Sequence, residues 1–126
     1  MIMEKPRILI IDDAPMIINM LGNTLKLDYT VIAAKDGEKG IVQAKKYLPA
    51  LIILDVMMPG MTGFEVLEVL KSDDDTKDIP VILLTGDGSY IAKEKGHSIG
   101  AADYIEKPFD METVKRSVKR YARKPD

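Results

Sequence analysis

Three acids stand where apolar runs of this sequence end. Asp12 and Asp13 follow the run 7–11, and Asp55 follows the run 51–54. Carboxylates that are brought together repel each other, and their proton affinity rises unless a cation compensates the charge. Oxygen ligands without histidine or cysteine suit Mg²⁺, which keeps several waters and can accept a phosphate oxygen as a further ligand. The acids therefore predict a magnesium site if the fold brings them to one place.

Two further polar side chains stand at the ends of predicted strands in the second half of the chain. Thr85 closes the apolar run 80–85, and Lys107 follows a short strand predicted at 103–106. A hydroxyl and an ammonium beside a metal-bound carboxylate provide what a phosphoryl group needs for its remaining oxygens. Taken singly, Thr85 is a strand-end hydroxyl, Lys107 a surface charge and each acid a solvated group or a helix cap. These side chains can bind a metal ion and a phosphoryl group only if the fold brings them together.

The elements that must position these side chains alternate along the chain. Apolar runs typical of buried strands are each followed by a segment with helical periodicity or a helix cap. Such alternation specifies a parallel sheet with helices on both faces, and right-handed crossovers favour the strand order 2-1-3-4-5. The predicted fold is α/β, a flavodoxin-like, doubly wound (βα)5 domain with a five-stranded parallel sheet. We expect strands at 7–11, 29–33, 51–54, 80–85 and 103–106. Helices are expected to open at Pro15, to span 38–48, 62–71 and about 89–98, and to follow a cap at Asp110.

The predicted strand order decides where the polar side chains meet. Strands 1 and 3 are neighbours whose helices leave to opposite faces, which opens a crevice at their carboxyl ends. We expect Asp12, Asp13 and Asp55 around this crevice. Thr85 and Lys107 belong to the same edge of the sheet, because parallel strands end together. The five side chains are therefore interpreted as one constellation.

Periodicity also predicts which helical residues face the core. In the first helix the core face is expected to leave Ile18 outside and to consist of Ile17, Met20, Leu21, Thr24 and Leu25. The second helix is expected to turn inward Ile41, Ala44 and Leu48. Gly96 lies inside the fourth helix, where glycine costs roughly 0.5–1 kcal/mol relative to alanine.

Composition narrows the functional class. The chain has 126 residues, which predicts one domain, and its net charge of -2 argues against nucleic acid as the default partner. It contains no cysteine, so neither disulfides nor thiolate metal sites are available. No apolar run approaches the ~18–20 residues of a membrane span. A cytoplasmic protein without a membrane partner is the plain interpretation.

Five short motifs stand in order along the chain at compatible spacing. They are Asp12-Asp13, Asp55 within Leu54-Asp55-Val56-Met57-Met58-Pro59-Gly60-Met61-Thr62-Gly63, Leu84-Thr85-Gly86, Gly100-Ala101-Ala102-Asp103-Tyr104, and Lys107-Pro108-Phe109. Together they resemble the receiver domain of two-component response regulators, including the chemotaxis-type single-domain receivers. The resemblance covers essentially residues 1–126, which are interpreted as one receiver domain. Either this domain stands alone, or it is the front of a longer protein; its downstream target is left open.

The resemblance implies that Asp55 is the phosphoacceptor. The donor would be a phosphohistidine on a sensor histidine kinase or a histidine phosphotransfer protein. The domain would catalyse only its own phosphorylation and dephosphorylation, and it would not be a multiple-turnover enzyme. Magnesium neutralises charge on the transferring group, and positioning does nearly all of the catalysis.

The resemblance also implies a ligand set. Asp13 would bind Mg²⁺ directly, with Mn²⁺ as a substitute ion, and Asp12 would bind it mostly through water. The Asp55 carboxylate and the backbone carbonyl of Met57 would complete the protein ligands. The phosphoryl oxygens would be held by Thr85, the backbone N–H of Gly86, and Lys107, while Tyr104 would swing as Thr85 moves. Gly86 departs from the family pattern, in which alanine is more usual.

Two structural expectations follow from this site. Lys107 must turn back into the crevice before Pro108, and an X–Pro bond is where a cis peptide costs least; the resemblance also implies that this bond is cis. A donor that is a helical bundle would suit a smooth apolar strip near the site. Pro15, Ile18 and Gly22 share one side of the first helix and are predicted to form the centre of the docking surface.

Three other functions were weighed. A flavin-binding module would need a phosphate loop rich in Ser, Thr and Gly after the first strand, where Asp12-Asp13 would repel a phosphate. An aspartate-nucleophile phosphatase would need an acid two residues after Asp55, where Met57 stands. Nucleic-acid binding is suggested by basic residues near the carboxyl end, Lys115, Arg116, Lys119, Arg120, Arg123 and Lys124, which are better interpreted as a solvated helix face.

Overall fold

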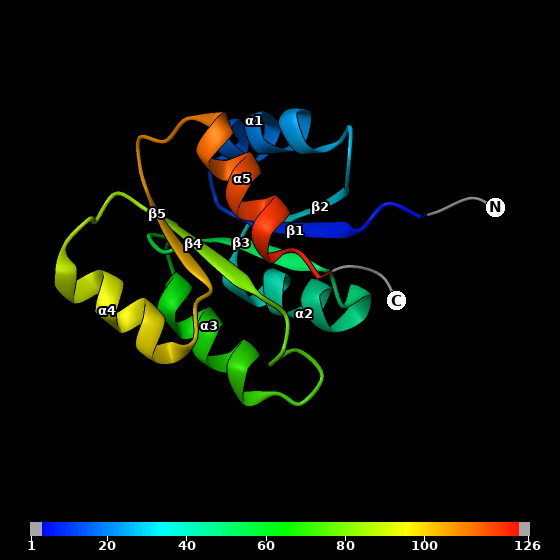
Figure 1. The fold of residues 1–126 in the computed structure, drawn as a ribbon. Coiled ribbons are helices and arrows are strands. Elements are labelled where there is room, and N and C mark those ends of the chain that lie inside the picture. Colours follow the sequence, from blue (N-terminus) through cyan, green and yellow to red (C-terminus); the bar gives the residue numbers. More distant parts are fainter. Residues whose placement is uncertain (1–3, 124–126) are drawn as a thin grey trace.

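Strands and helices alternate through the whole described range. The computed structural model describes residues 4–123. Its strands are β1 (Arg7–Ile11), β2 (Thr30–Ala34), β3 (Leu51–Asp55), β4 (Val81–Thr85) and β5 (Asp103–Glu106). Its helices are α1 (Pro15–Leu25), α2 (Gly37–Tyr47), α3 (Gly63–Ser72), α4 (Tyr90–Ile99) and α5 (Met111–Tyr121) (Figure 1).

The five strands form one sheet with the order β2-β1-β3-β4-β5. Every neighbouring pair is parallel. Helices α1 and α5 cover one face of the sheet, and α2, α3 and α4 cover the other (Figure 1). The predicted fold class, including the strand order, is therefore confirmed.

Alternation of side chains along each strand supplies both layers of the core. In β1, Ile8 and Ile10 pack with the α1/α5 side, whereas Leu9 and Ile11 pack with the side covered by the other three helices. All five positions of β3 are buried, as expected for a strand covered on both faces. Within residues 4–123, no helix has the length and apolar character that crossing a bilayer requires.

Short polar side chains mark where four helices begin, and at α4 this residue is Ser89. The Asp36 carboxylate accepts a hydrogen bond from the backbone N–H of the third residue after it, at the start of α2, and Asp110 does the same at the start of α5. Thr62 and Glu65 form the predicted capping box before α3, in which each side chain accepts the other residue's backbone N–H. These bonds satisfy donors that lack a partner inside the helix.

The predicted core face of α1 is partly wrong. Ile18 is half-buried and packs against the core beside Ile17, while Met20 is 38% exposed. Apolar residues at 17, 18, 20 and 21 are compatible with two overlapping stripes, so periodicity alone does not choose between them. Packing against α5 and the sheet selects the stripe that contains Ile18, Leu21 and Leu25.

Two other expectations need correction on the β2–α2 side. β2 begins one residue later than expected, at Thr30. α2 ends at Tyr47, and Leu48 is 54% exposed instead of facing inward. Leu48 has a φ of 44°, a left-handed conformation that ends the helix and carries its side chain off the buried face.

Gly63, the first residue of α3, links this fold to Asp55. Its N–H donates to the carbonyl of Val56 at 2.9 Å, and a Cβ at this position would lie 2.7 Å from the Val56 Cα and closer still to the Asp55 carbonyl oxygen. Backbone atoms in a buried strand cannot move aside cheaply. The close approach fixes the chain directly after Asp55.

We predict that Gly63→Ala destabilises the protein by about 1–3 kcal/mol, as overpacking does. Gly22→Ala in α1 is the matched control, because its Cβ would meet only a Val31 methyl at 3.8 Å. That control should gain about 0.5–1 kcal/mol from the smaller entropy of the unfolded chain. Urea unfolding of the two variants measures both changes, and equal stabilities would contradict the prediction.

Candidate functional site

The polar side chains predicted to converge lie at the carboxyl ends of four strands. Asp12 and Asp13 follow β1, and Asp55 is the last residue of β3. Thr85 is the last residue of β4, and Lys107 follows β5. Because β1, β3, β4 and β5 are consecutive neighbours in the parallel sheet, these ends share one edge.

The three acids are close enough to share one cation. A carboxylate oxygen from each of Asp12, Asp13 and Asp55 lies within 4.8 Å of the other two. Asp12 is 1% exposed and Asp55 3% exposed, whereas Asp13 is open to solvent. The cluster thus has two buried members and one at its mouth.

Asp12 has an incompletely satisfied carboxylate. Its Oδ1 accepts the Ala14 N–H at 2.9 Å, but its Oδ2 is buried and has no hydrogen-bond partner. Burial raises the pKa of the Asp12 carboxyl above its ordinary value, and the negative charge of Asp55 acts in the same direction. The Ala14 N–H and the Lys107 ammonium only partly oppose this rise.

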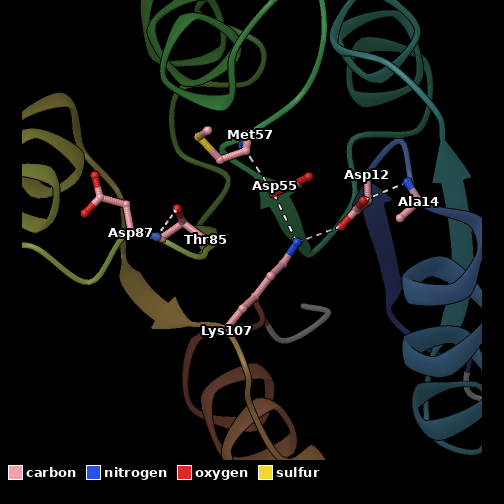
Figure 2. Close-up of polar contacts among 7 residues, drawn as sticks. All are labelled: Asp12, Ala14, Asp55, Met57, Thr85, Asp87 and Lys107. Carbon is pink, nitrogen blue, oxygen red and sulfur yellow. Dashed lines mark hydrogen bonds and ion pairs between the residues drawn. The ribbon is translucent and has the colours of Figure 1, made fainter.

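Lys107 is the cation that faces the acids. Its Nζ lies 3.3 Å from Asp55 Oδ1 and 3.8 Å from Asp12 Oδ2, and Figure 2 shows the side chain extending from the end of β5 into the space between the two carboxylates. Its backbone N–H donates to the Thr85 carbonyl at 2.7 Å. The Lys107–Pro108 bond is cis, which confirms the prediction.

A second donor holds the same oxygen of Asp55. The Met57 N–H lies 3.3 Å from Asp55 Oδ1, so this oxygen faces both Lys107 and the turn after β3 (Figure 2). The Met57 side chain is 69% exposed. Its backbone therefore follows the site closely while its thioether lies at the surface.

Thr85 connects the site to the loop before α4. Thr85 is fully buried, and its Oγ1 accepts the Asp87 N–H at 3.0 Å. The Tyr104 hydroxyl donates to the Asp87 carbonyl at 2.6 Å. The Asp87 carboxylate accepts the Ser89 N–H at 2.9 Å and is turned away from Asp55 (Figure 2).

The remaining predicted residues have less defined surroundings. Gly86 is exposed, and a Cβ added there would meet no atom within 4 Å. On α1, Pro15 is exposed, Gly22 is half-exposed, and Ile18 is partly taken up by the core. The predicted docking strip is thus less apolar at its centre than the sequence indicated.

Asp87 has hydrogen bonds that the sequence does not predict. The glycines on either side of it indicate only a flexible connection, yet Asp87 bonds Thr85, Tyr104 and Ser89. An Asp two residues before Ser at a helix start does indicate a hydrogen-bonded turn. That signal predicts the bond to Ser89 but not those to Thr85 and Tyr104, because they depend on how β4 and β5 pair.

The donor set fits a hard divalent cation. Three carboxylates with one buried, unpartnered oxygen provide oxygen ligands and excess negative charge, which Mg²⁺ or Mn²⁺ would satisfy. Burial and the neighbouring acids raise the pKa of the Asp12 carboxyl more than the Ala14 N–H and Lys107 lower it, and a bound cation would oppose this rise.

Comparisons with known proteins agree with this geometry. The sequence model of the response regulator receiver domain matches residues 8–119. The chain is 43% identical over 122 residues to the DNA-binding dual master transcriptional regulator RpaA of Synechocystis, covering 96% of this chain and 51% of RpaA. It is 41% identical over 105 residues to the response regulator PleD of Caulobacter vibrioides, covering 82% of this chain and 23% of PleD. The chain thus spans about half of RpaA and about a quarter of PleD.

Solved structures give the same result for the fold. The chemotaxis protein CheY4 of Vibrio cholerae matches with a TM-score of 0.88 and 34% identity, over 93% of this chain and 98% of CheY4. The activated receiver domain of DrrB matches with a TM-score of 0.83 and 29% identity, over 93% and 97% of the two chains. The chain therefore belongs to the response regulator receiver domain family and has that family's phosphoacceptor role in two-component signalling.

Proposed function

We propose that Asp55 is the phosphoacceptor and that the surrounding side chains act on it in distinct ways. The observation that carries the proposal is the buried Asp55 carboxylate, with Lys107 and the Met57 N–H both at 3.3 Å from its Oδ1. Within the described residues, both donors bind Oδ1 of Asp55, and neither binds its Oδ2. We assign the attack on phosphorus to Asp55 Oδ2.

The transfer forms one bond and breaks another. An Asp55 oxygen attacks the phosphorus of a phosphohistidine, the P–N bond of the donor breaks, and the imidazole leaves. Lys107 leaves the Asp55 carboxylate and holds one phosphoryl oxygen. The Thr85 hydroxyl donates a hydrogen bond to another phosphoryl oxygen, with the Gly86 N–H beside it. Positioning and charge compensation carry most of the catalysis in such a transfer.

The metal site belongs to the same proposal. Asp13 binds Mg²⁺ or Mn²⁺ directly, Asp12 mostly through water, and Asp55 and the Met57 carbonyl complete the protein ligands. When bound, the ion supplies positive charge that neutralises the acids and the transferring group. The buried Oδ2 of Asp12, which has no hydrogen-bond partner among the described residues, supports this assignment.

The wider role of the chain is proposed in the same terms. Residues 1–126 form one receiver domain that phosphorylates and dephosphorylates itself without multiple turnover. A sensor histidine kinase or histidine phosphotransfer protein is the donor, and movement of Thr85 and Tyr104 changes a docking surface for a downstream target. The predicted lack of direct nucleic-acid binding and the cytoplasmic location stay predictions; of the basic residues considered, Lys124 lies outside the described range.

The first test is chemical. With Mg²⁺ and acetyl phosphate, the protein should gain one acyl phosphate that is stable in acid and labile in base, and Asp55→Ala should abolish it. Asp74→Ala is the matched control, since this exposed acid pairs only with Lys77 on the α3–β4 connection. Intact-mass spectrometry measures the label. Full labelling of Asp55→Ala would overturn the assignment.

A second test addresses the metal site through stability. The raised pKa of Asp12 means that the folded protein binds more protons than the unfolded chain, so this group lowers stability as pH rises above its ordinary pKa. In EDTA, Asp12→Asn should therefore have the higher Tm at pH 7, and its advantage should shrink toward pH 4. Added Mg²⁺ should raise the Tm of the native protein more than that of the variant. A lower Tm for Asp12→Asn in EDTA at pH 7 would refute this account.

A third test locates the donor. We propose that Pro15, Ile18 and Gly22 form the centre of the docking surface, although Ile18 also packs in the core, which makes Ile18→Asp a poor probe. Gly22→Glu adds a charge where a Cβ has room, and it should slow transfer from the phosphohistidine donor at least about tenfold, as loss of an interface centre does. Val42→Glu adds the same charge at an exposed position of α2 and is the control. Equal transfer rates for both variants would place the interface elsewhere.

A further inference from the structure

Helix α4 contains a glycine in its interior, where this residue type lowers helix stability. Gly96 lies in the interior of α4 and is buried. A Cβ at this position would lie 2.9 Å from Leu83 Cδ1, 3.3 Å from Tyr104 Cδ2 and 3.6 Å from Tyr104 Cε2. The Tyr104 ring therefore lies against the surface that a side chain at position 96 would occupy.

The far end of Tyr104 is held as well. Its hydroxyl donates to the Asp87 carbonyl at 2.6 Å, so the ring is placed between α4 and the loop that precedes it. The atom nearest a Cβ at position 96 is Leu83 Cδ1, a terminal methyl group. A leucine methyl can move by rotation, whereas the tyrosine ring cannot move away from α4 without changing its bond to Asp87.

Asp87 connects Tyr104 to Thr85. The Asp87 N–H donates to Thr85 Oγ1 at 3.0 Å, and the Asp87 carboxylate accepts the Ser89 N–H. The Ser89 side chain in turn accepts the Ala92 N–H and caps α4. Because the Asp87 N–H occupies one lone pair of the Thr85 hydroxyl oxygen, it restricts the directions in which the hydroxyl proton can point.

We propose that Gly96 is a positioning residue for Tyr104 and, through Asp87, for the Thr85 hydroxyl. The missing side chain lets the ring lie against α4 with its hydroxyl on the Asp87 carbonyl. This contact steadies the loop residue whose N–H orients Thr85. The inference rests on the proposed function in one respect, namely that Thr85 holds a phosphoryl oxygen.

The first arm of the test needs no phosphoryl group. Gly96→Ala and Gly96→Val should shift the backbone amide resonance of Asp87 in the unphosphorylated protein, with the larger shift for valine. Gly40→Ala is the matched control, because this glycine of α2 would place its Cβ 2.5 Å from Ile11 and has no contact with Tyr104. It should lower stability and leave the Asp87 amide resonance in place. An unchanged Asp87 resonance in Gly96→Val would overturn the proposal.

The second arm measures the phosphorylated fraction of Asp55 at steady state with Mg²⁺ and acetyl phosphate. Gly96→Val should lower this fraction at least about twofold, the low end of coupling between contacting residues. In a Tyr104→Ala background the same substitution should have no effect, since the ring that it displaces is gone. A reduction that persists without the ring would assign the effect to Leu83 and the helix, and it would overturn the proposal.

The two arms also separate this inference from the proposed function. If the native protein gains no label at Asp55, the proposed function fails, and the Asp87 resonance alone decides the role of Gly96. If the native protein is labelled and Gly96→Val is labelled equally, the proposed function stands and Gly96 has no positioning role.

Discussion

Repulsion among three carboxylates is the constraint on which the rest of this structure depends. Asp12, Asp13 and Asp55 present oxygens within 4.8 Å of each other, two of these residues are buried, and Lys107 is the cation that faces them. Burial, ahead of the negative charge of Asp55, raises the pKa of the Asp12 carboxyl, and the Lys107 ammonium only partly opposes this rise. Close carboxylates repel each other, so such an arrangement favours the approach of added positive charge.

The fold can hold these crowded charges because the three acids lie at the ends of buried, interior strands. β3 is the central strand of the sheet, with β1 and β4 beside it, and its residues are buried from Leu51 to Asp55. Gly63 brings the start of α3 against the backbone at Asp55 and Val56. This contact limits main-chain movement that would carry the Asp55 carboxylate away from the other acids. Burial of apolar side chains in the strands thus offsets the repulsion between the carboxylates at the strand ends.

The same edge of the sheet reaches the surface through Thr85. Its hydroxyl meets the Asp87 N–H, and the Asp87 carbonyl meets the Tyr104 hydroxyl, so three residues from β4, β5 and the loop between β4 and α4 share one bonded path. The contact of Tyr104 with Gly96 extends this path to α4. A change at the buried hydroxyl therefore has a physical route to an exposed helix, which is what a signalling domain requires.

The sequence by itself determined the strand order, the edge where the polar residues meet, and the membership of Asp12, Asp13, Asp55, Thr85 and Lys107 in that edge. Those inferences depend on local apolar runs and on crossover handedness, which are written directly in the chain. Tertiary packing decided that Ile18 rather than Met20 joins the core, because adjacent apolar residues fit two stripes until α5 is in place. It also decided the partners of Asp87 and the purpose of Gly96, since both depend on how β4, β5 and α4 lie against each other, a relation between distant segments that no local pattern contains.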